Sequence, residues 1–217
     1  MAKKRTQSVK VDNDVHEAPP RKEPKFWNEA QKRCWDTISE NTVTLIKGPP
    51  GAAKTHISVA WAQYAVHRGE FNRIIFTRPI VEATESLGWL PGTVEQRTAP
   101  FMRPMQEIAS KVKLVEQTQI EVIPLAYMRG ITLDGCVAIG DEAQNFSESQ
   151  FILYLSRLGR GSKMIICGDT QQSDIRDSGL QWAINRLEGL PGVGVFEFTK
   201  ADIVRHPLVS SMLERLQ

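Results

Sequence analysis

The sequence predicts an α/β fold in which helices cover both faces of a mainly parallel sheet. From residue 25 onward, short apolar runs alternate with longer segments of helical pattern. The apolar runs lack polar alternation, as expected of strands that are buried on both faces. Alternating strands and helices imply right-handed crossovers between parallel strands. We therefore expect a three-layer α/β/α domain whose ligand lies beyond the carboxyl ends of the strands.

The elements follow one another in a regular order. The expected strands are residues 42–47, 73–77, 136–140, 163–167 and 195–199, and the expected helices are residues 55–67, 100–113, 147–158, 178–187 and 207–216. Residues 1–24 are rich in charge and nearly devoid of apolar side chains, so we expect a disordered tail there. The remaining residues, 25–217, are expected to form one domain.

Composition restricts the class of protein. Of the 217 residues, 41% are hydrophobic and 24% are charged, which is typical of a globular protein. The net charge of +2 gives no bulk attraction to nucleic acid or membrane, so any such binding must be local. No apolar run approaches the roughly 20 residues that cross a bilayer, and we expect no membrane contact and a cytoplasmic location. The three cysteines lack C-x-x-C spacing and are expected to be buried thiols.

The segment "GPPGAAKT" follows the first expected strand and approximates the phosphate-binding pattern G-x-x-x-x-G-K-[ST]. Its loop residues are Gly48, Pro49, Pro50, Gly51, Ala52 and Ala53. In such a loop the backbone surrounds a phosphate, Lys54 reaches the outer phosphates and Thr55 holds magnesium. Ala53 stands where the pattern has glycine, and a left-handed backbone there costs alanine about 1–2 kcal/mol. A plain turn that begins a helix is the alternative interpretation.

Two further strand ends carry polar groups. Asp141 and Glu142 directly follow an apolar run, where one carboxylate orients magnesium and its neighbour polarises a water molecule. Asp169 and Gln171 follow the next strand, in reach of a terminal phosphate. Taken alone, the acidic pair is also typical of the first turn of a helix. Asp169 and Gln171, taken alone, are also typical of an ordinary turn. Three such groups at successive strand ends predict a site for ATP and Mg²⁺.

Several motifs resemble the PhoH-like family of P-loop ATPases. They are "FTRP" at 76–79, "LGWLPG" at 87–92, "PLAYMRG" at 124–130, "GDEAQN" at 140–145, "GDTQQSDI" at 168–175 and "VRHPLV" at 204–209. The same segments are similar to the first motor domain of superfamily 1 helicases. The resemblance implies a RecA-like P-loop NTPase core with a magnesium–ATP site, often linked to RNA metabolism or phosphate starvation.

The resemblance also implies roles for single residues. Lys54 and Thr55 match the phosphate and magnesium ligands, and Asp141 and Glu142 match the metal-linked acid and the catalytic base. Gln171 matches the phosphate sensor. Gln31 is similar to the glutamine that reads adenine, and Arg205 is placed to stabilise phosphoryl charge. A surface glutamine on an amphipathic helix and a structural ion pair are the respective alternatives.

One departure from the family concerns the acidic pair. Gly140 replaces the usual bulky aliphatic residue before Asp141. We expect this glycine to remove packing beneath Asp141 and to loosen that carboxylate, which would slow hydrolysis.

A nucleic-acid surface is predicted after the second strand. Arg78, Arg97 and Arg103 are interleaved with Trp89 and Phe101, which suits phosphate contact and base stacking. Aromatic side chains that merely pack a loop onto the core are the alternative.

Assembly is expected because no second motor domain follows residue 199. The nucleotide state of one subunit would then be coupled to movement of the nucleic-acid strand on another subunit. We therefore expect a homo-oligomer such as a hexameric ring. Arg157, Arg160 and Lys163 are expected to face a neighbouring subunit's nucleotide.

The resulting prediction is an ATPase that uses magnesium and acts on RNA or single-stranded DNA. The alternative is a nucleotide-binding regulatory or interaction module with weak or no hydrolysis. A small-molecule kinase is a third hypothesis, which the acidic pair and the lack of a lid segment disfavour.

Overall fold

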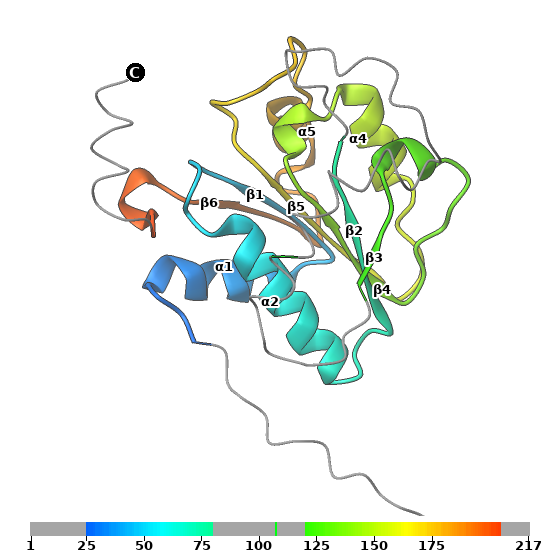
Figure 1. Cartoon of the computed structure of the whole chain (residues 1–217), viewed down its shortest axis with the longest axis horizontal. Helices are drawn as coiled ribbons and strands as arrows, with labels where there is room; N and C mark the ends of the chain where they lie inside the picture. Colours follow the sequence, from blue (N-terminus) through cyan, green and yellow to red (C-terminus); the bar gives the residue numbers. More distant parts are fainter. Residues whose placement is uncertain (1–24, 80–106, 108–119, 205–217) are drawn as a thin grey trace, which may run out of the picture.

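A computed structural model describes residues 25–79, 107 and 120–204 of the chain (Figure 1). Its helices are α1 (Glu29–Glu40), α2 (Lys54–His67), α4 (Glu148–Leu155) and α5 (Leu180–Leu187), with 3-10 turns η1 (Leu125–Tyr127), η2 (Ala143–Asn145) and η3 (Lys200–Asp202). The strands are β1 (Val43–Lys47), β2 (Arg73–Thr77), β3 (Ile120–Val122), β4 (Cys136–Gly140), β5 (Lys163–Gly168) and β6 (Val193–Glu197).

The strands form one sheet in the order β3-β2-β4-β5-β1-β6, and every pair is parallel. The predicted mainly parallel sheet is therefore confirmed. Strand β5 separates β1 from β4, so the loop after β1 and the acidic pair after β4 reach toward each other across the end of β5. All of these loops leave the same edge of the sheet, because the strands are parallel.

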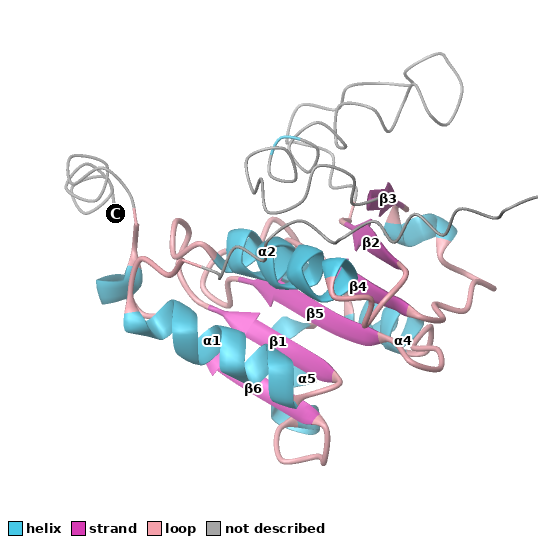
Figure 2. Cartoon of the chain, turned by 90° about the horizontal axis from the view of Figure 1, so that it is seen from below, coloured by secondary structure: helices cyan, strands magenta, loops and turns pink. Residues whose placement is uncertain are grey.

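Helices cover both faces of the sheet (Figures 1 and 2). On one face, α1 and α2 bury apolar side chains such as Ile38, Trp61 and Ala62 against Ile46, Ile139 and Ile165. On the other face, α4, α5 and the turns η1 and η2 bury Leu125, Phe146, Phe151 and Leu180 against Leu45, Ala138 and Ile166. The three-layer α/β/α prediction is confirmed. Among the described helices, none is long and apolar enough to span a membrane.

The prediction and the structure differ at a few elements. Strand β6 begins two residues before the predicted start, because Val193 pairs with Val43 at the beginning of β1. The short edge strand β3 was not predicted, since three residues are too few to give a pattern. The predicted tail 1–24, the helix at 207–216 and, apart from Glu107, the helix at 100–113 lie outside the described residues.

The predicted subunit-facing role of Lys163 is wrong. This side chain is buried at the end of α1, where its ammonium donates to the carbonyl oxygens of Ile38, Ser39 and Asn41. It also lies 4.7 Å from the centre of the Trp61 ring. Lys163 therefore satisfies carbonyl groups that the C-terminus of a helix leaves without partners.

We expect Lys163→Ala to lower the free energy of unfolding by about 2–3 kcal/mol, because buried carbonyl oxygens lose a charged donor. Arg160→Ala is the matched control, since Arg160 is exposed, and its effect should stay within about 0.5 kcal/mol. Urea unfolding of the two variants measures the difference. Equal effects would contradict the structural role of Lys163.

Candidate nucleotide site

A cavity of ≈ 390 Å³ lies at the carboxyl edge of the sheet. Ala53, Lys54 and Thr55 line it from the loop and helix after β1, Asp141 and Glu142 from the end of β4, and Asp169 from the end of β5. The structure thus brings together the three groups of residues that the sequence placed at strand ends.

Ala53 adopts the left-handed conformation, with φ 66° and ψ 24°, directly before α2. The loop thus has the backbone shape for which the usual pattern uses glycine. Alanine adopts this backbone conformation at a cost of about 1–2 kcal/mol. The loop therefore has the conformation of a phosphate-binding loop, with backbone strain at Ala53.

The Lys54 ammonium is folded back onto its own loop. It donates to the carbonyl oxygens of Gly48 at 2.6 Å and Pro49 at 3.0 Å. Burial lowers the pKa of Lys54, because desolvation disfavours the charged form. The loop carbonyls therefore hold this cation, and phosphate oxygens would offer it a stronger partner.

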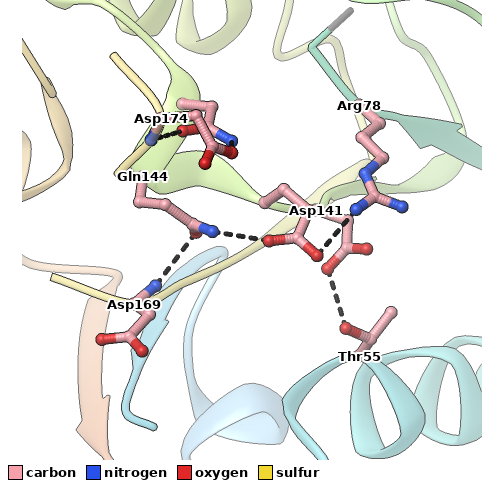
Figure 3. Close-up of polar contacts among 8 residues, drawn as sticks. Thr55, Arg78, Asp141, Gln144, Asp169 and Asp174 are labelled. Atoms are coloured by element: carbon pink, nitrogen blue, oxygen red, sulfur yellow. Dashed lines mark hydrogen bonds and ion pairs between the residues drawn. The ribbon is translucent and has the colours of Figure 1, made fainter. Parts of the chain in front are cut away.

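Thr55 and Asp141 meet across the end of β5. The Thr55 hydroxyl donates to Asp141 Oδ1 at 2.7 Å (Figure 3). Asp141 is only 5% exposed, and burial, followed by the nearby Glu142 charge, raises its pKa to about 6. A hydroxyl and a buried carboxylate are oxygen ligands of the kind that Mg²⁺ prefers. This pair therefore fits the predicted metal ligands.

Glu142 is held through both carboxylate oxygens. Arg78 forms an ion pair with Oε1 at 2.8 Å, and the Gln144 amide donates to Oε2 at 2.5 Å. Glu142 itself is left-handed, with φ 51°. Arg78 was predicted to contact nucleic acid, and the structure pairs its guanidinium with the predicted catalytic base; its contact with nucleic acid stays a prediction.

Gln144 is a site residue that sequence reasoning missed. Its side-chain oxygen accepts the Asp169 N–H at 3.0 Å, so it links the end of β5 to the acidic pair (Figure 3). Gly168 permits this approach, because a Cβ on residue 168 would lie only 2.9 Å from the backbone nitrogen of Gln144. Its place in the "GDEAQN" motif was the available signal, although nothing in the sequence shows that this glutamine is buried.

The loop after β5 is tied to the same turn. The Asn145 amide donates to the Asp174 carboxylate at 2.8 Å, and the Asp174 N–H donates back to Asn145 at 2.9 Å. Gln171, the predicted phosphate sensor, is exposed and does not line the cavity, whereas Gln172 does. The role of Gln171 stays a prediction.

Gln31 is buried, so the alternative of a surface glutamine on α1 is wrong. Its oxygen accepts the Trp27 N–H at 2.9 Å, and its amide nitrogen has no partner in the described part of the chain. Trp27 stacks on His56 with ring centres 4.8 Å apart, and His56 lines the cavity. Gln31 itself does not line the cavity, so its role at adenine stays a prediction.

The remaining predicted residues are not placed. Trp89, Arg97, Arg103 and Arg205 lie outside the described residues. Val204, which immediately precedes Arg205, lines the cavity and donates its N–H to Gly51.

The expectation that Gly140 leaves a gap beneath Asp141 is wrong. A Cβ on Gly140 would lie 3.0 Å from Tyr154 and 3.5 Å from Phe146, and both rings are fully buried. The aromatic pair fills the space that an aliphatic side chain would occupy, so the support beneath Asp141 is intact.

Solved structures share this fold. The large terminase of a thermophilic bacteriophage, solved in complex with ADP, matches 87% of this chain and 50% of its own at a TM-score of 0.59 and 12% identity. The parallel sheet and the loop after β1 define a three-layer P-loop NTPase fold of the RecA-like kind.

The chain belongs to the PhoH-like protein family, whose sequence model matches residues 25–217. It is 45% identical over 194 residues to a Bacillus subtilis PhoH-like protein, covering 85% of this chain and 61% of that protein. It is 37% identical over 198 residues to Escherichia coli Protein PhoH, covering 86% and 56%. The chain thus spans a little over half the length of these relatives.

We expect Ala53→Gly to raise the free energy of unfolding by about 1 kcal/mol, because glycine adopts the left-handed backbone without strain. Ala52→Gly is the control, since Ala52 is not left-handed and the change should lower stability by about 1–2 kcal/mol, through unfolded-state entropy and the loss of a buried methyl group. Thermal unfolding compares the two. A lower free energy of unfolding in Ala53→Gly would contradict the claim that the left-handed backbone of Ala53 is strained.

The Asp141 carboxyl should make stability depend on pH. Its pKa is raised from 3.8 to about 6 in the folded protein, so it opposes folding once ionised, and stability falls as pH rises through about 6. Asp141→Asn should therefore raise the free energy of unfolding by about 2 kcal/mol at pH 8 without metal, and the gain should vanish near pH 4. The exposed Asp177→Asn is the control. A gain that does not change with pH would contradict this cause.

Proposed function

We propose that this chain is an ATPase that hydrolyses ATP with magnesium. The observation that supports it most is the Thr55–Asp141 hydrogen bond of 2.7 Å, with Glu142 beside it and Lys54 on the same cavity wall. These groups supply a metal ligand pair, a base and a phosphate-binding cation in one cavity. The ADP complex of the structurally similar terminase supports the class of ligand.

Each residue has a role that follows from its contacts. When nucleotide binds, the Lys54 ammonium donates to phosphate oxygens in place of the carbonyl oxygens of its own loop. The Gln31 side chain donates its amide N–H to the adenine ring. Thr55 and Asp141 would hold Mg²⁺, which would offset the negative charge of the phosphates when bound. Glu142 orients the attacking water and takes its proton, and Arg78 and Gln144, which bond its two oxygens, set the direction in which it faces that water.

A nucleotide-binding module without turnover is the second candidate. It is favoured by one observation, namely that Arg78 and Gln144 already hydrogen-bond the two oxygens of Glu142 and hold this carboxylate in place. In that case the cavity would bind nucleotide and control a partner, and the acidic pair would serve only binding.

The proposal extends to partners. We propose that ATP hydrolysis is coupled to the binding or remodelling of RNA or single-stranded DNA. The proposed assembly is a homo-oligomer, such as a hexamer. Sedimentation with magnesium and ATP should then give a particle several times the 24.4 kDa mass of the chain. A monomer under these conditions would contradict the assembly.

Phosphate release from magnesium–ATP tests the proposed activity. Glu142→Gln should lower turnover by about 10²–10⁴-fold, the usual contribution of a positioned base, while nucleotide binding persists. Glu148→Gln, which changes an exposed acid on α4, is the matched control and should retain turnover. Equal phosphate release by the wild type and Glu142→Gln, with nucleotide still bound, would establish the binding module instead.

A further inference from the structure

Arg78 connects the acidic pair to the next strand of the sheet. It directly follows β2, whose last residue, Thr77, accepts the Asp141 N–H at 2.9 Å. The two strand ends are thereby fixed side by side, and the Arg78 guanidinium reaches Glu142 Oε1 at 2.8 Å. The Arg78 side chain remains 28% exposed, so an anion from solvent can reach it.

The ion pair restrains Glu142. A general base must face the water molecule from which it takes a proton, and here Arg78 bonds one oxygen of Glu142 and Gln144 the other, so these two partners set the direction of the carboxylate. The Gln144 bond is internal to the site, because Gln144 is buried and also bonded to Asp169. Arg78 is the more accessible of the two partners and therefore the one that an external ligand can remove.

The surface beside Arg78 suits a single strand. The chain after β3 is fixed to β2 by the Ile123 N–H, which donates to Phe76 two residues before Arg78. The next turn, η1, exposes Tyr127 at 49%, and Arg129 is exposed after it. An exposed aromatic ring and an exposed arginine in the segment after β3, together with Arg78 after β2, have the chemistry that stacks bases and contacts phosphates.

We propose that Glu142 and a phosphate of a bound single-stranded nucleic acid compete for Arg78, so that strand binding releases Glu142. Arg78 is thus a positioning residue for the proposed base, and the catalytic consequence rests on the proposed ATPase function. The competition itself requires no hydrolysis. By reciprocity, the Glu142 charge must weaken strand binding through Arg78.

A double-mutant cycle on strand affinity tests this competition. The probe is a fluorescein-labelled oligouridine or oligothymidine, titrated at fixed salt without nucleotide and followed by anisotropy. Glu142→Gln should tighten binding about fivefold, at the lower end of typical couplings between sites. In an Arg78→Gln background the same change should have no effect, and Glu148→Gln should have none in either background.

Every result decides the inference. A fivefold gain that persists without Arg78 would be a general charge effect and would overturn the competition, as would unchanged or weaker binding by Glu142→Gln. Absence of strand binding by the wild type would also overturn it. If the cycle shows coupling but the wild type releases no phosphate, the competition stands and the proposed ATPase function fails alone. Arg78→Met, which keeps the aliphatic length and removes the charge, provides a second background if Arg78→Gln does not fold.

Discussion

The hydrogen bond between Thr55 and Asp141 is the contact on which the whole site depends. It joins the start of α2 to the end of β4, although β5 lies between the two strands from which they come. Only a parallel order that places these strand ends at one edge allows a hydroxyl on one loop to reach a carboxylate on another. Burial makes the charge of this carboxylate unfavourable and so raises the pKa of Asp141, and the hydrogen bond from Thr55 opposes that rise only in part. A cation between the two loops would relieve that cost.

Backbone strain is concentrated at the same place. Among the described residues, Ala53 and Glu142 are the non-glycine residues with positive φ, and both line the cavity. Such conformations persist where the surroundings over-determine them, and they often lie at functional sites. Here Ala53 is followed at once by α2, and Glu142 is fixed by Arg78 and Gln144. The helix and these side chains thus hold the loop after β1 and the proposed base in fixed positions.

The sequence was sufficient for most of the sheet and for one half of the site. Continuous apolar runs mark buried strands, and motif spacing places Lys54, Thr55 and Asp141 after them. The contacts of Arg78 and Gln144 were beyond prediction, because a basic or amide side chain in a loop has the same pattern whether it faces solvent or a buried carboxylate. The packing beneath Gly140 was likewise hidden, since the aromatic rings that fill it come from later segments of the chain.

Magnesium-dependent ADP binding tests the central claim most directly, namely that the ends of β1 and β4 form one metal–nucleotide site. Calorimetric titration would compare ADP affinity with and without Mg²⁺ in the wild type and in Thr55→Val, which keeps the shape and removes the hydroxyl. The account predicts at least about tenfold tighter binding with Mg²⁺, equivalent to about 1.4 kcal/mol, and loss of this gain in Thr55→Val. ADP binding that ignores Mg²⁺, or a gain that survives in Thr55→Val, would contradict it.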